Sequence, residues 1–215
     1  MLQATLFDGV QAVHEPLRNP VLTARVGKNA PLFADICRLY VPEGSRVLDM
    51  TYGYGHFWES PGLAAAYDLI TMDIERQATV RASLKRLPFK YDTFDAVILD
   101  PPYATHGGRH SPSTYDRAAE LYNLDAENSR QTIAEFYDSG IGQGWLVLKQ
   151  KGVLIVKCQD AEQTWWHIKV LNESQQWGFK AEDLFVLVQE GVPPMRHPYQ
   201  HHARKNHSYF WVFRK

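Results

Sequence analysis

The chain has 215 residues, of which 45% are hydrophobic and 22% charged, ordinary values for one globular domain with its own core. A formal net charge of −1 excludes a global basic field for holding nucleic acid, so any such binding needs a local patch. The sequence lacks apolar runs of transmembrane length, a signal-peptide pattern and metal-type cysteine spacing, which predicts a cytoplasmic protein with reduced thiols.

The N-terminal quarter predicts an irregular segment, a helix and a strand. Residues 1–28 are punctuated by prolines and glycines. Residues 31–40 carry apolar side chains at helical spacing behind Pro31, a residue that suits a first helical turn. Residues 46–50 then predict a short apolar strand. Because no repeat or low-complexity linker divides the chain, we expect a single domain over residues 1–215.

A glycine-rich stretch follows that first strand. Asp49, Thr51, Gly53 and Gly55 alternate along it. A strand, a Gly-x-Gly turn and then a helix bring backbone N–H groups close to a ligand in an open α/β sheet. The stretch lacks the Lys-Ser/Thr pair of a phosphate-binding loop and the third glycine of a dinucleotide site. A ligand-binding loop and a plain connection to a helix both stay open.

The second strand, over residues 69–73, also ends in a carboxylate, Asp73. An acidic residue about twenty residues after a glycine loop is well placed for ribose hydroxyls, and a solvated strand-end aspartate is the alternative. Residues 74–89 are too few for a crossover helix plus a strand. We therefore expect a short strand at residues 79–82 and a loop at residues 87–89.

The apolar strand 94–99 ends abruptly at Asp100-Pro101-Pro102-Tyr103, because neither proline can donate to a strand ladder. The prolines also hold the backbone of this corner stiffly. Such a corner suits a flat molecule with an amino group. Asp100 and the Pro101 carbonyl can accept its two N–H bonds, and the Tyr103 ring can stack on its face. A proline-rich turn with a capping aspartate is the alternative.

The second half of the chain predicts two helices and three further strands. The helices are expected at residues 127–149 and 164–177, although glycines inside the first weaken its helix propensity. The strands are expected at residues 152–158, 183–189 and 207–213. We expect the last two strands to form an antiparallel, hairpin-like edge of the sheet.

Residues 104–124 and 191–206 form two polar loops, and a long insertion just beyond the proline corner predicts a substrate loop. The candidate nucleic-acid contacts in the two loops are His106, Arg109, Arg196, Arg204 and Lys205. A metal site at His197, His201 and His202 would lack a nearby cysteine or carboxylate, so we expect no metal. For residues 191–206, a solvated polar loop without a binding role stays the alternative.

Three motifs stand in order along the chain: Asp49-x-Thr51-x-Gly53-x-Gly55, then Asp73, then Asp100-Pro101-Pro102-Tyr103. Together they resemble the S-adenosylmethionine-dependent amino-methyltransferases that act on nucleic-acid bases, over residues 25–160 and the final strand 209–215. The resemblance implies a single α/β domain of the Rossmann-like class I methyltransferase type, with a mostly parallel seven-stranded sheet and a C-terminal antiparallel strand. It also implies S-adenosylmethionine as the cofactor. The motif order resembles the arrangement typical of the adenine enzymes.

The same resemblance implies a set of cofactor-binding residues: Lys28, Asn29, Asp49, Thr51, Gly53, Gly55, Asp73, Ser83, Leu87 and Phe89. Either of the first two would border the cofactor's carboxylate, and the glycine-loop residues would line its methionine part. Asp73 would bind its ribose, and the two apolar residues would wall its adenine ring. Ser83 stands where the family often has an acidic residue that holds the adenine amino group.

The activity that the resemblance implies is methyl transfer to the exocyclic amine of a base, with N6 of adenine in DNA placed first. Asp100, Pro101, Pro102 and Tyr103 would be catalytic, and a duplex base would be flipped into their corner. Methylation of N4 of cytosine or of an RNA base is the alternative within the class. A non-catalytic cofactor-binding subunit of a nucleic-acid-modifying assembly is the alternative outside it. The expected partner is nucleic acid, DNA before RNA, without a membrane; a homodimer or a partner protein is compatible with the sequence.

Overall fold

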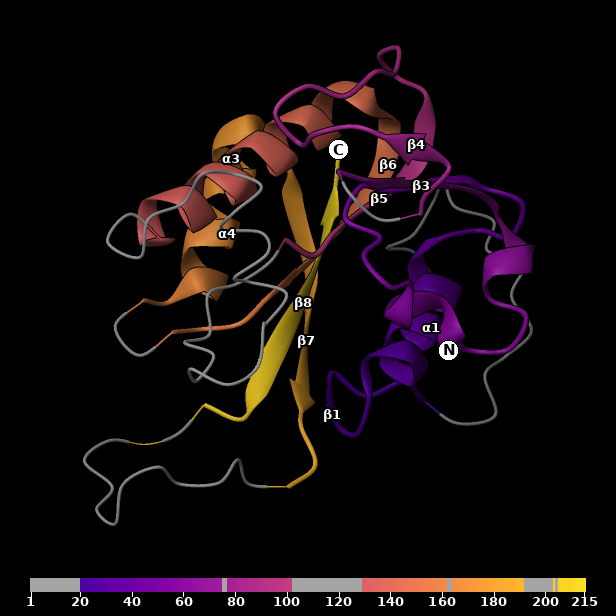
Figure 1. Cartoon of the computed structure of the whole chain (residues 1–215). Coiled ribbons are helices and arrows are strands. Elements are labelled where there is room, and N and C mark those ends of the chain that lie inside the picture. The colour runs from indigo at the N-terminus through magenta and orange to yellow at the C-terminus, as the bar shows by residue number, and fades with distance from the viewer. Residues whose placement is uncertain (1–19, 75–76, 102–128, 162–163, 192–202, 204) are drawn as a thin grey trace, which may run out of the picture.

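The computed structural model describes residues 20–74, 77–101, 129–161, 164–191, 203 and 205–215, with the backbone alone for 129–132. The strands in these ranges are β1 (Ala24–Val26), β2 (Arg46–Asp49), β3 (Asp68–Asp73), β4 (Val80–Arg81), β5 (Phe94–Leu99), β6 (Leu148–Cys158), β7 (Lys180–Val188) and β8 (His207–Arg214). They form one sheet in the order β1-β7-β8-β6-β5-β2-β3-β4 (Figure 1). Strand β8 runs antiparallel to both β6 and β7, and the other pairs are parallel.

Helices cover both faces of the sheet (Figure 1). Helix α1 (Asn29–Tyr40) lies on one face, and α3 (Ser129–Val147) with α4 (Trp166–Trp177) lies on the other. Central parallel strands buried on both faces have near-continuous apolar sequences, and β5 fits this rule closely. None of the helices in the described ranges is long and apolar enough to cross a membrane.

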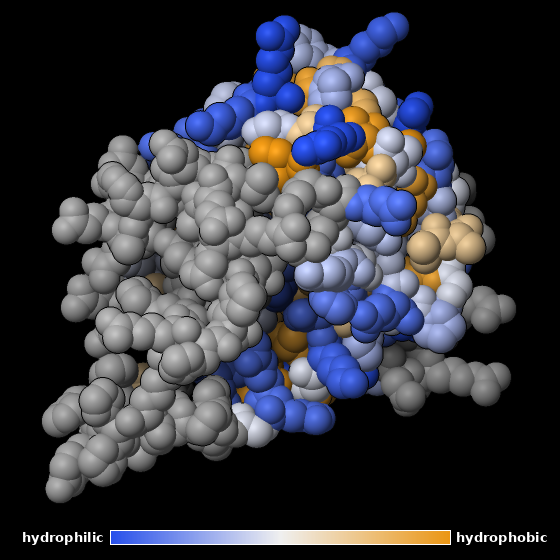
Figure 2. Space-filling model, in the orientation of Figure 1, coloured by the Kyte–Doolittle hydropathy of each residue, from blue (hydrophilic) through white to orange (hydrophobic). Residues whose placement is uncertain are grey.

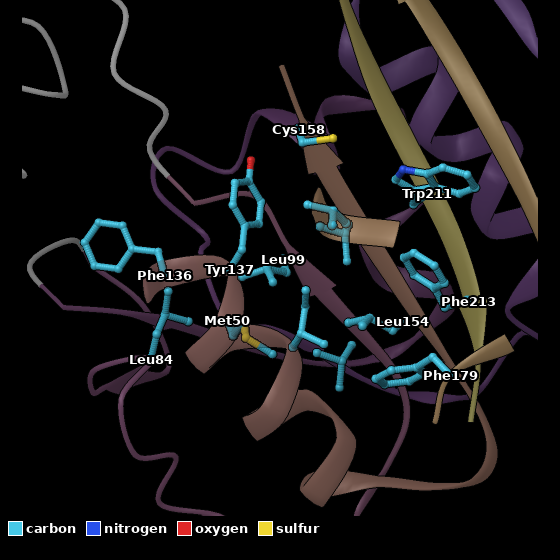
Figure 3. Packing of buried hydrophobic residues seen from close by; sticks show 14 of the residues in the cluster. Met50, Leu84, Leu99, Phe136, Tyr137, Leu154, Cys158, Phe179, Trp211 and Phe213 are labelled. Atoms are coloured by element: carbon cyan, nitrogen blue, oxygen red, sulfur yellow. The ribbon is translucent and has the colours of Figure 1, made fainter. Parts of the chain in front are cut away.

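The sheet has a hydrophobic core on each face. Successive side chains of a strand point to opposite faces, so neighbouring residues pack into different cores. In β5, Ala96 and Ile98 pack with α1, whereas Val97 and Leu99 pack with α3 and α4. Figure 3 shows the second of these cores, in which Leu99 of β5 lies close to Tyr137 of α3 and Leu154 of β6 lies near Phe213. On the surface shown in Figure 2, apolar side chains of the described residues are scattered among hydrophilic ones.

Most predicted elements are confirmed, and the mostly parallel α/β sheet with an antiparallel C-terminal strand is confirmed as well. The count of seven strands was wrong, because eight are present in the described residues. The extra strand is β1, which lies inside the segment 1–28 that we expected to be irregular. Its three residues pair in parallel with β7. A run of three residues is too short for the sequence to predict such a long-range pairing.

Two further expectations need correction. The last two strands pair as predicted but do not form an edge, because β8 lies between β6 and β7 and β1 flanks β7. The glycine loop does not lead into an α-helix. Between β2 and β3, where all residues are described, the chain forms the short 3-10 helices η1 (His56–Glu59) and η2 (Ala64–Ala66). The first of them buries Phe57 and Trp58 in the same core as the apolar side chains of α1.

The parallel strands end at one edge of the sheet, which we call the carboxyl edge. It carries the residues that follow β1, β2, β3, β4, β5, β6 and β7, and β8 starts there because it runs the other way. Ligands of open α/β sheets bind at this edge. The carboxyl edge is therefore where the sequence motifs converge.

Candidate active site

Three carboxylates reach the carboxyl edge on the side of the sheet that α1 covers. Asp49 ends β2, Asp73 ends β3 and Asp100 directly follows β5. Side chains two residues apart on a strand point to the same face of the sheet. Val47 and Ile98 pack toward α1, so Asp49 and Asp100, two residues further on, lie on that face as well. The spacing of the sequence motifs thus becomes a spatial cluster through strand alternation.

Asp100 forms an ion pair with a lysine of the neighbouring strand. The parallel register of β5 and β6 pairs Leu99 with Val156, which brings Asp100 and Lys157 side by side. The Lys157 Nζ donates to Asp100 Oδ2 at 3.2 Å, and the lysine side chain is only 4% exposed. Aromatic rings of Phe57 and Phe210 lie 5.6 and 6.0 Å from the same ammonium group.

The second oxygen of Asp100, Oδ1, is buried and has no hydrogen-bond partner among the described residues. Burial raises the pKa of the Asp100 carboxyl group, and the charge and hydrogen bond of Lys157 oppose that rise. A buried acceptor without a donor is unusual in a folded protein and points to a bound group that supplies one. One oxygen of Asp100 is therefore committed to the protein, and the other is available to a ligand.

The glycine loop and the proline corner are joined by hydrogen bonds. The Asp100 backbone N–H donates to Thr51 Oγ1 at 2.7 Å, and the Met50 N–H donates to the Ile98 carbonyl at 3.1 Å. Pro101 is buried directly after the corner begins. Thr51, predicted to bind the cofactor, thus also holds the backbone of the proposed catalytic aspartate.

Asp49 is committed to protein donors on both oxygens. Its Oδ1 accepts the Thr51 N–H at 3.0 Å, and its Oδ2 accepts the Trp58 indole N–H at 2.8 Å. Burial raises its pKa to about 7, a rise that these two bonds oppose and that the charges of Asp100 and Asp73 reinforce. Asp49 therefore stabilises the glycine loop through these two hydrogen bonds, and its contact with a cofactor stays a prediction.

Asp73 and the glycines give the loop its form. The Gly53 N–H donates to Asp73 Oδ2 at 3.0 Å, linking the loop to the end of β3. Gly55 has φ +74°, and a Cβ there would lie 2.6 Å from the Tyr52 hydroxyl oxygen. A side chain at this position would meet both backbone strain and a steric clash. The alternating glycines thus allow a tight turn at the carboxyl edge, which supports a ligand-binding loop over a plain connection.

The residues predicted to surround the adenine ring lie beyond β4. Ser83 forms a tight turn, in which its hydroxyl accepts the Lys85 N–H at 3.3 Å and its carbonyl accepts the Arg86 N–H at 3.2 Å. Leu87 is buried in the core, and Phe89 packs edge-on against a ring of β5 at 5.0 Å. These contacts anchor the segment, and its role in binding adenine stays a prediction.

Lys28 and Asn29 lie where β1 passes into α1. Lys28 is exposed at the N-cap position and Asn29 opens the helix. One turn further on, the Phe33 ring stacks on Phe57 at 4.7 Å, and Phe57 lies beside Lys157. The start of α1 is therefore connected by packing to the Asp100–Lys157 pair, and the cofactor-binding role of Lys28 and Asn29 stays a prediction.

Several predicted site residues lie outside the described residues: Pro102, Tyr103, His106, Arg109, Arg196 and Arg204. The histidines of the conceivable metal site lie outside as well. Of the predicted nucleic-acid contacts, Lys205 is described. Its Nζ lies 4.1 Å above the ring of Trp165, an exposed tryptophan, and donates to the Ala161 carbonyl. Within the described part of the chain, no group of three or more potential metal ligands is present.

Sequence reasoning missed Lys157 and Trp58. The signal for Lys157 was present in the strand Gly152–Cys158, where a single lysine stands near the end of an otherwise apolar run. A buried strand tolerates a charged residue when a partner of opposite charge is close. The identity of the partner, however, depends on which strand lies beside it. Trp58 carried no comparable signal.

The charge of the site favours a cation. Asp49, Asp73 and Asp100 approach the carboxyl edge, where Lys157 pairs with Asp100. A nearby positive charge stabilises the ionised form of carboxylates in such a cluster. The arrangement suits a ligand that carries positive charge near the glycine loop.

Comparison with known proteins gives likeness at the level of fold. No family model and no curated protein matches the sequence. TrmN from Thermus thermophilus has a TM-score of 0.56 at 15% identity, with 86% of this chain and 48% of that chain covered. This chain therefore spans about half the length of that protein.

Two other solved structures match over most of both chains. A 1,6-didemethyltoxoflavin-N1-methyltransferase from Burkholderia thailandensis, with S-adenosylhomocysteine bound, has a TM-score of 0.52 at 11% identity, covering 85% of this chain and 76% of that one. The [4+2]-cyclase SpnF has a TM-score of 0.51 at 15% identity, covering 85% and 80%. Since a cyclase shares the fold, the reaction must be argued from the site. The chain has the Rossmann-like class I fold of S-adenosylmethionine-dependent methyltransferases.

Proposed function

We propose that the chain is an S-adenosylmethionine-dependent methyltransferase that acts on the exocyclic amine of a base, with N6 of adenine in DNA placed first. The observation that carries this proposal is Asp100, a carboxylate at the carboxyl edge with one oxygen paired to Lys157 and the other buried without a donor. An amine N–H is the kind of group that this second oxygen lacks.

The residues at the edge fit the proposed cofactor. S-adenosylmethionine supplies an electrophilic methyl group on a sulfonium, and its positive charge is compatible with the acidic residues of the carboxyl edge. Asp73, about twenty residues after the glycine loop, stands where ribose hydroxyls are bound in related sheets. The left-handed Gly53 and Gly55 let the loop backbone approach a ligand closely.

Asp100 would act by orienting the amine. An exocyclic amine is a poor nucleophile because its lone pair is delocalised into the ring. Acceptance of its N–H bonds by Asp100 Oδ1 and the Pro101 carbonyl favours a more tetrahedral nitrogen and directs the lone pair at the methyl group. The bound cofactor would supply the methyl group, its sulfur would keep the electron pair of the broken bond, and the methylated nitrogen would lose a proton to water. Positioning of this kind can lower a barrier by several kcal/mol or more.

The choice of base is supported by sequence alone. The motif order and Asp100-Pro101-Pro102-Tyr103 resemble the adenine enzymes, so we place DNA adenine first and N4 of cytosine or an RNA base second. Recognition is assigned to the loops 104–124 and 191–206. A non-catalytic subunit is the alternative of a different class, and the sequence Asp100-Pro101-Pro102-Tyr103 speaks against it, because a merely structural partner would not need that chemistry.

The first prediction tests Asp100 directly. We expect Asp100→Ala to lower methyl transfer by about 10²-fold or more, since a group that contacts the reacting atoms is removed. Cofactor affinity should stay close to that of the wild type, because Lys157 and the glycine loop remain. The assay follows labelled methyl groups into duplex DNA, single-stranded DNA and RNA, and mass spectrometry of the nucleosides identifies the methylated base. Calorimetry measures cofactor binding.

The matched control is Asp95→Ala at the opposite end of β5, where the aspartate pairs with Lys149 on the protein surface. This variant should keep wild-type turnover. Full activity of Asp100→Ala on any substrate would overturn the catalytic role. Cofactor binding by the wild type without product on DNA, RNA or free nucleosides would favour the non-catalytic subunit.

A further inference from the structure

Lys157 is an unusual residue for its position. It stands near the end of β6, a central strand, with its side chain 4% exposed. Lysine is rarely buried to this degree without a partner, because desolvation penalises its charged form. Its ammonium group lies 3.2 Å from Asp100 Oδ2 and beside two aromatic rings, Phe57 and Phe210. These contacts fix the position of the Lys157 ammonium group beside Asp100.

The pair divides the two oxygens of Asp100 between two tasks. Lys157 occupies Oδ2, while Oδ1 lies buried without a partner in the described part of the chain. Since Oδ2 accepts from Lys157, a proton on the acid would sit on Oδ1 and present a donor to the amine, so acceptance of an amine N–H at Oδ1 requires the ionised carboxylate. Burial raises the pKa of Asp100 and so works against its ionisation. A nearby positive charge is therefore needed to keep the carboxyl group ionised.

We propose that Lys157 is a positioning residue that keeps Asp100 ionised and turns Oδ1 toward the substrate amine. The inference rests on the proposed function and deepens it by naming the residue on which the amine acceptor depends. Lys157 acts through Asp100 and does not itself touch the reacting atoms.

Other titratable groups also face Asp100. Asp49 ends β2 nearby, and the Cys158 thiol follows Lys157 on β6. The charge of Asp100 raises the pKa of both groups, which shows that they lie within its electrostatic reach. Among these neighbours, Lys157 supplies the positive charge.

The same two strands provide a matched control. At the opposite end of β5 and β6, Lys149 Nζ lies 2.8 Å from Asp95 Oδ1. That pair joins the same residue types across the same strands but is exposed to solvent. Exposed ion pairs contribute little because solvent screens them. Lys149→Met therefore removes a similar ion pair without touching the site.

The first test needs no substrate. Carbon-13 NMR of aspartate-labelled protein follows the Asp100 carboxyl group, with Asp100→Asn used to assign its signal. We expect Lys157→Met to raise the titration midpoint of Asp100 by about 1–3 pH units, the effect of removing an adjacent opposite charge. Lys149→Met should leave that midpoint unchanged. An unshifted midpoint in Lys157→Met would overturn the proposal.

The second test measures turnover. Lys157→Met should lower kcat at least about tenfold at neutral pH and leave the KM for S-adenosylmethionine within about twofold, because cofactor contacts are untouched. Activity should recover as pH rises above the shifted midpoint, and Lys157→Arg should restore part of it. A kcat equal to that of Lys149→Met would contradict the inference.

Folding and function remain separable in this design. If Lys157→Met does not fold, the double variant Lys157→Met with Asp100→Asn removes both charges; recovery of folding supports the dependence of the Asp100 charge on Lys157, and failure to fold contradicts it. If the wild type transfers no methyl group to any amine, the proposed function fails. The NMR titration still decides whether Lys157 holds Asp100 ionised.

Discussion

Asp49 is a carboxyl group that the fold has enclosed almost completely, with 2% of its surface exposed. The Thr51 backbone and the Trp58 indole each donate to one of its oxygens. These bonds favour the ionised form, whereas burial favours the neutral acid, and burial is the larger effect. A residue that was predicted from its place in a motif thus proves to be a structural support of the glycine loop.

The balance at Asp49 predicts a dependence of stability on pH. Its pKa is raised from 3.8 to about 7 in the folded protein, so between these values the folded state holds a proton that the unfolded state has lost. The Asp49 contribution to stability therefore falls as pH rises through this window and levels off above it. We expect the loss of stability caused by Asp49→Asn to be smaller at pH 8 than at pH 5, as measured by urea unfolding.

Asp68→Asn on β3 is the control, because it removes a negative charge from an exposed side chain. Its effect should differ little between the two pH values. An Asp49→Asn effect of equal size at pH 5 and pH 8 would show that the carboxyl group is already ionised at pH 5 in the folded protein.

At the scale of the element, α3 shows how packing overrides helix propensity. Glycines at positions 140, 142 and 144 weakened the expectation of a continuous helix, yet α3 runs unbroken over Ser129–Val147. A Cβ at Gly140 would lie 2.7 Å from a methyl carbon of Leu99 on β5, and one at Gly142 would lie 2.5 Å from the Trp177 ring of α4. Two of the glycines therefore let the helix approach its neighbours closely.

The same helix supplies a matched pair of substitutions. Gly140→Ala should lower the free energy of unfolding by about 1–3 kcal/mol, because Leu99 is fully buried and has no room to move. Gly144→Ala meets its nearest atom at 3.4 Å and should be neutral or stabilising by up to about 1 kcal/mol. Urea unfolding followed by circular dichroism measures both. Equal changes in the free energy of unfolding for the two variants would show that helix propensity, and not packing, determines the effect of these substitutions.

For the whole molecule, the decisive feature is that seven strands of the sheet end at one edge. Segments from residue 28 to residue 157 meet there, although the chain between them crosses both faces of the sheet (Figure 1). A ligand at this edge would touch loops from several strands and so would stabilise the fold as a unit.

This arrangement predicts a thermal shift. S-adenosylmethionine at 100 times its dissociation constant should raise the free energy of unfolding by about 2.7 kcal/mol. For a chain of this length, that corresponds to a rise in Tm of about 5–10 °C. Asp73→Ala, which removes the carboxylate that holds the Gly53 N–H, should show a smaller shift at the same concentration.

Asp68→Ala at the exposed start of the same strand should keep the full shift, and differential scanning fluorimetry compares the three proteins. A wild-type Tm that does not respond to millimolar cofactor would speak against cofactor binding at the carboxyl edge.

Local patterns were enough to predict most helices and strands and three of the acidic strand ends. Runs such as Phe94–Leu99 are apolar over their whole length, and proline or glycine ends them, so each element is encoded in its own few residues. Asp49, Asp73 and Asp100 could be proposed as one site because parallel strands share a carboxyl edge.

Long-range pairing decided the rest. The insertion of β8 between β6 and β7, the addition of β1 and the pairing of Asp100 with Lys157 each depend on which strands lie side by side. Local sequence specifies that a buried lysine needs a partner but not where the partner lies. The register that pairs Leu99 with Val156 supplies the answer, because it sets a carboxylate and an ammonium group next to each other in a buried site.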